Sequence, residues 1–173
     1  NPCASFWETR QRMNKSEVKP RCEFYIGSDL IIIDAEMMPI ISKFTWHIKP
    51  DKKTKYVCTS AKIGGRNTSI SMHRLLTGLS NSQIDHINRN GLDNRLINLR
   101  FATNKENSYN RERKNSLGFR GVYKHKNNFA FQIQKDGKRY GGYGFLSAED
   151  AAKAYDLKNK ELHGEFGIRN FKD

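Results

Sequence analysis

The sequence predicts an α+β protein with a β-rich N-terminal region, a polar middle segment and a C-terminal unit of three strands and one helix. Runs of β-branched and aromatic residues separated by turn residues occupy residues 22–72, as is typical of antiparallel strands. Residues 119–163 contain three more strand-like runs and then one capped helical segment. A chain of 173 residues has room for one or two small domains.

The charge of the chain indicates a polyanionic partner. Lys and Arg number 31 against 18 Asp and Glu, which gives a net charge of +13. Nucleic acid is the first candidate and an anionic membrane surface the second. A membrane-spanning helix needs about 20 apolar residues, and the longest apolar run is Leu30–Ile33. We therefore expect no membrane partner.

The cysteines and the first residues bear on compartment. Three cysteines are an odd number without a C-x-x-C pair, so a four-thiolate zinc site is excluded and a disulfide framework is not expected. The first fifteen residues lack the apolar core of a secretory signal, although a removed signal stays open because the chain does not begin with Met. We expect a cytoplasmic protein, in a bacterium or a phage-infected cell.

The N-terminal region is expected to hold an arm, five strands and a short helix. The arm covers residues 1–21. Glycine-containing turns at 27–29 and 64–67, and a proline-containing turn at 50–53, separate the strands. The expected strands are 22–26, 30–33, 44–48, 55–59 and 68–72, and the helix spans about 73–77 and ends at Gly78.

The C-terminal unit is expected to be a hairpin-rich sheet covered by one helix. After a linker at 114–118, the expected strands are 119–124, 129–134 and 138–145, and Asp136-Gly137 is a strong two-residue hairpin signal. Ser147 is the expected N-cap of the helix and Gly164 its C-cap. Helix-to-sheet packing is expected of Ala151, Ala154, Tyr155 and Leu162.

Residues 79–113 are poor in aliphatic periodicity, so we expect something other than a core, such as a metal site, to organise them. Asn98 follows His86 by twelve positions, and Asn107 follows Asn98 by nine. Phosphodiester hydrolysis needs a base for water and a cation for the phosphate. His86 titrates near neutral pH and suits the base, while Asp85 and Asn107 offer hard oxygen atoms to Mg²⁺.

The expected geometry is strand, loop, strand and helix. Adjacent strand residues face opposite sides, so Asp85 and His86 share a site only at a bulge or a strand end. The run 88–93 is expected to be a loop that returns to a strand at 99–101. A helix is expected to open at 104, where Asn107 and Asn110 share one face.

This segment resembles the HNH, or ββα-metal, nuclease motif of phage-type homing endonucleases. The matching phrases, in order, are His73-Arg74-Leu75, Ile84-Asp85-His86, Leu92-Asp93-Asn94-Arg95, Asn98-Leu99-Arg100 and Glu106-Asn107…Asn110. The resemblance implies a nuclease domain over 22–113, made of a β-rich leader (22–78) and a ββα-metal core (79–113). It implies hydrolysis of DNA that leaves 3′-hydroxyl and 5′-phosphate ends.

The resemblance also implies residue roles. His86 is expected to be the general base, Asp85 and Asn107 the metal ligands, and Asn98 the brace that holds the loop and orients His86. Many HNH enzymes have histidine where this chain has Asn107, so we expect weak binding of Mg²⁺, with Mn²⁺ or another divalent cation able to substitute. His73 and Asn110 are possible additional site residues.

Residues 119–173 resemble a second family, the plant ethylene-response-factor (APETALA-type) DNA-binding domain, which is also found appended to phage HNH nucleases. The matching phrases include Phe119-Arg120-Gly121-Val122-Tyr123, Ser147-Ala148-Glu149-Asp150-Ala151-Ala152 and Asn170-Phe171. The resemblance implies a three-stranded sheet lying in the major groove of DNA and packed on one helix. The strands lack the tryptophans and some of the arginines of the plant pattern, so the plant target sequence does not carry over.

Basic and amide side chains are the expected DNA contacts. Between residues 86 and 126 there are ten Lys or Arg against three acidic residues, a basic track that joins the two regions. Gln suits adenine and Arg suits guanine, whereas Lys more often meets phosphate. The expected contacts are Arg89, Arg95, Arg100, Arg111, Arg113, Arg120, Lys124, Gln132, Gln134 and Arg139.

The sequence therefore predicts a metal-dependent endonuclease of phage homing type that nicks or cuts double-stranded DNA at a preferred site. We expect it to act as a monomer or weak dimer without a small-molecule cofactor. The alternative is a DNA-binding regulator that carries an inactive HNH fold. An RNA-binding protein is a third hypothesis, which the expected major-groove sheet disfavours.

Overall fold

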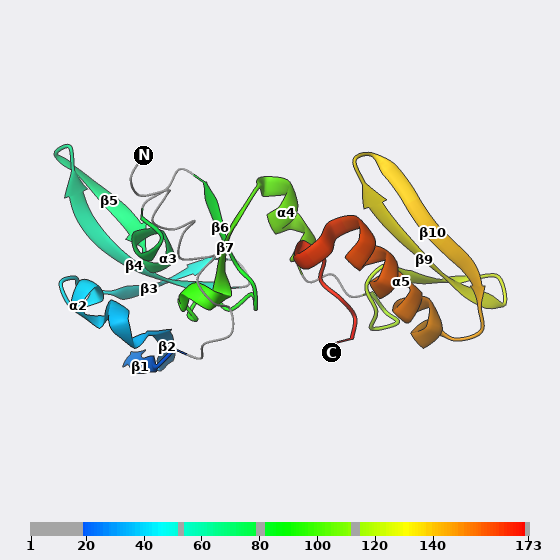
Figure 1. Cartoon of the computed structure of the whole chain (residues 1–173), viewed down its shortest axis with the longest axis horizontal. Coiled ribbons are helices and arrows are strands. Elements are labelled where there is room, and N and C mark those ends of the chain that lie inside the picture. The colour runs from blue at the N-terminus through cyan, green and yellow to red at the C-terminus, as the bar shows by residue number, and fades with distance from the viewer. Residues whose placement is uncertain (1–18, 52–53, 79–81, 112–114, 172–173) are drawn as a thin grey trace. The chain divides into compact units, whose positions relative to one another are not determined.

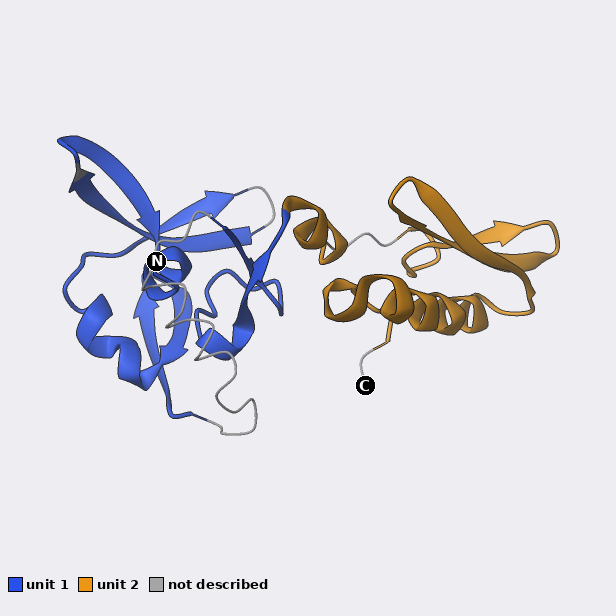
Figure 2. Cartoon of the chain, turned by 45° about the horizontal axis from the view of Figure 1, so that its top comes forward, with its two compact units in different colours: residues 1–103 blue, residues 104–173 orange. Residues whose placement is uncertain are grey.

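The computed structural model describes residues 19–51, 54–78, 82–111 and 115–171. It confirms the predicted α+β class (Figure 1). The chain divides into two compact units, unit 1 (residues 1–103) and unit 2 (residues 104–173), which Figure 2 colours separately. Most of the predicted arm (1–18) lies outside the described residues.

The described part of unit 1 contains small antiparallel sheets and short helices. The strands pair as β1–β2, β3–β4–β5 and β6–β7. They are β1 Arg21–Ile26, β2 Asp29–Asp34, β3 His47–Asp51, β4 Thr54–Ile63, β5 Arg66–Ser71, β6 Gln83–His86 and β7 Leu99–Ala102. The helices are the 3-10 helix η1 Ala35–Met37, α2 Met38–Ile41, α3 Met72–Leu76 and the 3-10 helix η2 Leu96–Asn98.

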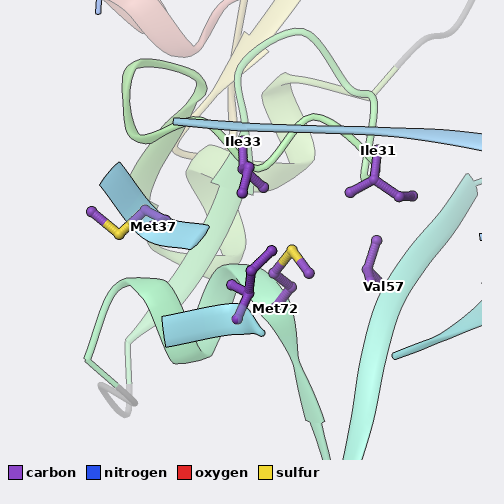
Figure 3. Packing of buried hydrophobic residues seen from close by; sticks show 6 residues of the cluster. Ile31, Ile33, Met37, Val57 and Met72 are labelled. Atoms are coloured by element: carbon purple, nitrogen blue, oxygen red, sulfur yellow. The ribbon is translucent and has the colours of Figure 1, made fainter. Parts of the chain in front are cut away.

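The core of unit 1 forms between β2, β4 and the helices that follow the strands. Ile31 and Ile33 are two positions apart on β2, so they share a face, and both are fully buried. Figure 3 shows Ile31 facing Val57 of β4, while Ile33 lies near Met72 and Met37. Burying a side chain of this size stabilises a fold by roughly 1.5–3 kcal/mol. This core fixes β2 and β4, and both strands contact the loop that follows β6.

The expected strand at 44–48 is wrong for its first three residues, because β3 begins only at His47. The Trp46 indole nitrogen donates to the Ile41 carbonyl oxygen at 2.8 Å, and Trp46 packs against the core of unit 1. The Thr45 carbonyl accepts a hydrogen bond from Thr59 Oγ1 at 2.8 Å. Residues 44–46 therefore form the connection in which Trp46 binds the last carbonyl of α2, and the chain enters the sheet only after it. The alternation of apolar and polar residues over 44–48 does not distinguish such a connection from a strand.

Unit 2 is a three-stranded antiparallel sheet covered by one long helix. The strand order is β10–β9–β8, and α5 packs against the sheet. Its core includes Val122, Phe131, Ile133 and Tyr155. The elements are α4 Asn104–Tyr109, β8 Val122–His125, β9 Asn128–Lys135, β10 Lys138–Phe145, α5 Ala148–His163 and the 3-10 helix η3 Gly164–Phe166.

Local signals correctly placed the β9–β10 turn and the two ends of α5. Asp136 and Gly137 take φ values of 51° and 77°, and the flanking Lys135 and Lys138 pair across the two-residue turn, as predicted. Ser147 caps α5 by accepting a hydrogen bond from the Asp150 amide at 3.0 Å. Gly164 follows the helix with a φ of 55°. The predicted caps of α5 are thus confirmed.

The first strand of this sheet begins later than expected. β8 starts at Val122, whereas the prediction placed the strand at 119–124. Gly121 has a φ of 72°, and a Cβ there would collide with the Tyr155 ring of α5. The chain thus turns closely over the helix before it joins the sheet. Among the described residues, no helix is long and apolar enough to cross a membrane.

Candidate active site

The β6–β7 hairpin carries the predicted catalytic pair. Asp85 lies opposite Arg100 and His86 opposite Leu99 in the antiparallel pairing. His86 is the last residue of β6, which is the strand end that the sequence required for the pair to share a site. Asp85 and His86 are both buried. They are therefore held by packing and do not move freely at the surface.

Asn98 ties down the loop that joins the two strands. Its Oδ1 accepts a hydrogen bond from the Asn88 amide at 2.9 Å, and its Nδ2 donates to Asn88 Oδ1 at 2.9 Å and to the Asp93 carbonyl at 2.7 Å. Its own carbonyl accepts from the Ile87 amide at 2.8 Å. A buried amide with this many partners fixes the path of the chain directly after His86.

The side chain beside the His86 ring is Asn94, which the sequence analysis did not select. Asn94 Oδ1 lies 3.4 Å from His86 Nε2, and Asn94 has no exposed surface. Asn94 lies within the matching segment Leu92–Arg95, where every neighbouring polar residue could equally be a loop residue. Its full burial, visible only in three dimensions, identifies it.

Two aromatic residues of the leader also enclose His86. The His73 ring meets the His86 ring edge-on, with centroids 4.9 Å apart. The Tyr56 ring lies 5.6 Å from the His73 ring and 5.9 Å from the His86 ring. His73 Nε2 is 3.1 Å from Ser71 Oγ. The structure thus brings His73, named as a possible additional site residue, against His86.

Burial keeps both imidazoles in the neutral form. It lowers the pKa of His73 from 6.5 to about 3, with His86 and Arg74 adding to the effect. It also lowers the pKa of His86, against the opposing influence of Asn94, Asp85 and Asp93. A neutral imidazole has a free electron pair for a proton, so His86 suits a general base at neutral pH.

Asp85 is held by a buried arginine. Arg100 donates from Nε and Nη2 to Asp85 Oδ2 at 2.9 and 2.7 Å, and its side chain is 9% exposed. Arg100 was predicted to contact DNA, but the structure places its guanidinium on the carboxylate. The two residues are direct cross-strand partners, a relation that the correct strand register would have revealed.

The leader strands hold the site loop from behind. The Ile32 amide of β2 donates to the Leu92 carbonyl at 3.0 Å, and the Ile32 carbonyl accepts from the Asn94 amide at 2.7 Å. Asp34 Oδ2 accepts from the Leu96 amide at 2.7 Å. β2 therefore pairs with the site loop through one isolated parallel bridge, between Ile32 and Asp93. The leader is a structural part of the site.

The predicted basic contacts of unit 1 differ in their surroundings. Arg89 is exposed and has a φ of 65°. Arg95 donates from Nε and Nη2 to Asp93 at 2.8 and 2.7 Å, and this pairing lowers the pKa of Asp93 against the opposing effect of burial. Asp93 is therefore engaged inside the loop.

In unit 2, the predicted ligand Asn107 lies half-buried on α4. Asn110 follows that helix and is buried. Tyr109 stacks on His163 with ring centroids 3.8 Å apart. Arg111 offers its carbonyl to Arg120, and Arg113 lies outside the described residues. α4 is thus packed within unit 2.

The predicted contacts on the sheet of unit 2 fall into two groups. Gln134 and Arg139 are direct cross-strand partners, and Gln132 lies two positions from Gln134, so these three share the exposed face. Lys124 pairs with Phe129, which packs into the core, so Lys124 belongs to the opposite face. Arg120 Nε donates to the Tyr155 hydroxyl at 2.8 Å.

Two tyrosines that the prediction did not include lie on the same exposed face. Tyr123 of β8 and Tyr143 of β10 both pair with Ala130, on either side of β9. Tyr143 is 82% exposed and Tyr123 is 42% exposed. Large aromatic rings left in solvent beside Gln and Arg side chains are typical of a binding surface.

The oxygen donors of the site fit a hydrated Mg²⁺ better than a metal held only by protein. No group of three or more His, Cys, Asp or Glu side chains that could hold a metal occurs among the described residues. Mg²⁺ keeps several waters and binds through one or two carboxylates. Asp85 offers such a carboxylate, although Arg100 already occupies its Oδ2.

A strand-end Asp-His pair on a hairpin, beside a tied loop, defines the class of site found in ββα-metal nucleases. A family model described as HNH endonuclease matches residues 80–109. An uncharacterised HNH endonuclease of Acanthamoeba polyphaga mimivirus is 32% identical over 146 residues, which cover 80% of this chain and 73% of that protein. The chain belongs to the HNH endonuclease family.

Nucleases of this family generally depend on a divalent metal ion. No solved structure matches this chain. The matched segment 80–109 runs from β6 through α4, so it crosses the division between the two compact units at residue 103.

Proposed function

We propose that this protein is a divalent-metal-dependent endonuclease that hydrolyses phosphodiester bonds of double-stranded DNA at a preferred site. The observation that carries the proposal is the placement of Asp85 and His86 at the end of β6, with the following loop fixed by Asn98. A carboxylate for a cation beside a neutral imidazole for water is the pair that this hydrolysis needs. Membership of the HNH family supports the nuclease activity.

In this reaction His86 accepts a proton from water while the water oxygen forms a bond to phosphorus. The bond between phosphorus and the 3′ oxygen breaks, and that oxygen takes a proton from solvent. Asp85, with Asn107 as the second ligand expected from the sequence, would hold a cation that offsets negative charge on the leaving oxygen. The products are 3′-hydroxyl and 5′-phosphate ends.

The target preference is proposed to come from unit 2. Its exposed sheet face presents Gln132, Gln134 and Arg139 at alternating positions of neighbouring strands. Side chains with paired donors and acceptors discriminate base edges in the major groove. A nuclease domain joined to a reader of this kind supports a homing endonuclease, which cuts at one or few sites.

The first prediction concerns His86→Ala. It should abolish nicking of supercoiled plasmid in Mg²⁺, because no base remains for the water, while gel-shift affinity for the same duplex stays within about 2-fold. General-base catalysis typically contributes about 10²–10⁴-fold to the rate. Wild-type protein in a chelator should also fail to cut. Products should re-ligate without kinase treatment, since they carry 5′-phosphates.

The matched control is His47→Ala, which removes an exposed histidine of the same unit. It should cut like wild type. If His86→Ala lost DNA binding together with cleavage, His86 would be a binding or folding residue, and its assignment as the base would be wrong.

One observation favours a second function, a DNA-binding regulator with an inactive HNH fold. Arg100 holds Asp85 Oδ2 with two hydrogen bonds, and a guanidinium in that position competes with a cation for the carboxylate. Plasmid incubated with wild-type protein and Mg²⁺ or Mn²⁺ separates the two functions. Uncut plasmid despite a gel shift of the same DNA would favour the regulator.

A further inference from the structure

We propose that Asn94 fixes the tautomer of His86 and so determines which ring nitrogen acts as the base. Asn94 is thereby a positioning residue of the hydrolysis. The tautomer is a property of the folded chain alone, whereas its effect on the rate rests on the proposed function.

The Asn94 amide is held in one orientation. Its Nδ2 donates to the Gly91 carbonyl at 3.4 Å, so its Oδ1 faces the other way, toward His86 Nε2. Its backbone amide is anchored to the Ile32 carbonyl at 2.7 Å. The side chain has no exposed surface. An exchange of the amide's two ends would set its oxygen against the Gly91 carbonyl oxygen, which is also only an acceptor.

An amide oxygen is only an acceptor, so the ring nitrogen that faces it must carry the hydrogen. In the neutral ring of His86 the proton therefore lies on Nε2, and the electron pair lies on Nδ1. The nitrogen that takes the proton from water is then Nδ1. A base held in the opposite tautomer would present a hydrogen where the reaction needs an electron pair.

The leader supplies the rigidity behind this contact. A Cβ on Gly91 would meet the Lys55 carbonyl oxygen and the Tyr56 ring, so the backbone at Gly91 lies close against β4. The edge of the His73 ring against His86 restricts rotation of the ring. Strand β4 and helix α3, both distant in sequence from the loop, thus fix the acceptor and the ring that faces it.

Asn94 and Asn98 have separate tasks. The amide of Asn98 is engaged by the backbone and side chain of Asn88 and by the Asp93 carbonyl, which shape the loop. Asn94, by contrast, directs its side-chain oxygen at the His86 ring, 3.4 Å from Nε2. Loss of Asn98 should therefore loosen the loop, whereas loss of Asn94 should release the tautomer.

The test is the tautomer itself, measured on the full 173-residue chain in a chelator. Two-bond ¹H–¹⁵N correlation spectra distinguish an Nε2-protonated ring from an Nδ1-protonated one, and the His86→Gln spectrum identifies the His86 signals. Wild type should show the Nε2–H form. An Nδ1–H form in wild type would overturn the inference, whether or not the protein cuts DNA.

Two near-isosteric variants separate tautomer from packing. Asn94→Leu removes the acceptor, so its His86 signals should shift toward a tautomer mixture, and kcat should fall about 10²-fold with KM little changed. Asn94→Asp keeps an acceptor, so it should retain the Nε2–H form. Its kcat should stay close to that of the wild type, unlike the kcat of Asn94→Leu. The control Asn67→Ala, on the exposed β5 hairpin, should match wild type.

A folded Asn94→Leu protein that keeps the Nε2–H form would overturn the inference. If Asn94→Leu fails to fold, the wild-type and Asn94→Asp spectra still decide, because an Nδ1–H form in either contradicts it. A wild-type protein with the Nε2–H form that never cuts DNA would count against the proposed function and leave the tautomer assignment standing.

Discussion

The residues at the end of β6 are governed by burial more than by their intrinsic chemistry. Asp85 and Arg100 would be an unremarkable ion pair at the surface, where such pairs contribute little. Inside unit 1 each charge depends on the other, because a buried charge without its partner is costly. His73 and His86 respond to the same burial by remaining neutral. The ion pair and the two neutral rings therefore depend on the folding of unit 1.

Acid should destabilise the protein through His73. Its folded pKa of about 3 lies below the unfolded value of 6.5, so the unfolded chain binds more protons between these values. The contribution of neutral His73 to the free energy of unfolding is fully present above pH 6.5 and is lost as the pH falls toward the folded pKa. The loss reaches at most about 1.4 kcal/mol per pH unit. Urea midpoints from pH 7 to 5 in a chelator should fall less steeply for His73→Asn than for wild type.

The exposed His47 provides the comparison for this titration. His47→Asn should keep the wild-type dependence on pH, because the His47 side chain lies exposed at the surface of unit 1. Equal slopes for wild type and His73→Asn would show that His73 protonates without cost, and the burial argument would fail.

Arg100→Leu should destabilise unit 1 by about 3–5 kcal/mol in a chelator, because it leaves the Asp85 carboxylate buried without its partner. Divalent cations should then restore part of the loss, since Asp85 gains a free oxygen. Thermal unfolding with and without an excess of Mg²⁺ measures both effects. Arg66→Leu, on the exposed β4–β5 hairpin, should change neither. A variant as stable as wild type would contradict the ion-pair argument.

At the scale of elements, the β1–β2 hairpin and β4 act as the back wall of the site loop. β2 pairs with the loop through Ile32, and β4 lies against it at Gly91. The backbone bonds of Ile32 and the close approach at Gly91 hold the loop at two neighbouring places. The local shape after His86 therefore depends on strands that lie far earlier in the sequence.

Gly91→Ala should disturb this wall. The added Cβ would lie 2.8 Å from Tyr56 Cδ1 and would press on the Lys55 carbonyl, so the loop must shift. We expect a loss of about 1–3 kcal/mol in the free energy of unfolding, typical of overpacking, and a lower kcat. Urea unfolding and plasmid nicking measure the two. Ser69→Ala on exposed β5 is the control, and a wild-type result for Gly91→Ala would refute the close approach.

Local signals were predictable from the sequence, and long-range contacts were not. The Asp136-Gly137 turn and the Ser147 cap each depend on residues within four positions, and both are confirmed. The pairing of Ile32 with the loop at Asp93 joins segments far apart in sequence, and no periodicity encodes it. Asn94 was therefore missed, and Arg100 was expected at the DNA instead of on Asp85.

At the scale of the whole molecule, the proposed function places chemistry and targeting in different compact units. Unit 1 holds Asp85 and His86, and unit 2 holds the sheet face with Gln132, Gln134 and Arg139. The net charge of +13 acts on both, since long-range attraction to a polyanion does not depend on which residue carries it. Base preference should instead depend on the few side chains of one face.

The triple variant Gln132→Ala, Gln134→Ala and Arg139→Ala should lose site preference while it still nicks DNA. Each paired contact to a base contributes about 1–3 kcal/mol of discrimination. Cleavage mapping on a randomised duplex library should show a flatter site profile than wild type.

The control for the sheet face is Lys124→Ala, which changes the opposite face of the same sheet. It should weaken binding to all duplexes alike and leave the site profile unchanged. If Lys124→Ala flattened the profile as much as the triple variant did, the exposed face would not be the reader.

The pairing of β2 with the site loop sets a lower limit on how far this nuclease can be trimmed. A fragment that begins at residue 79 keeps every residue of the matched motif yet loses Ile32 and Tyr56, the backing of Asn94 and His86. The smallest transferable cassette therefore starts at β1. A comparison restricted to the short motif would leave out the leader strands, which hold Asn94 and His86 in place.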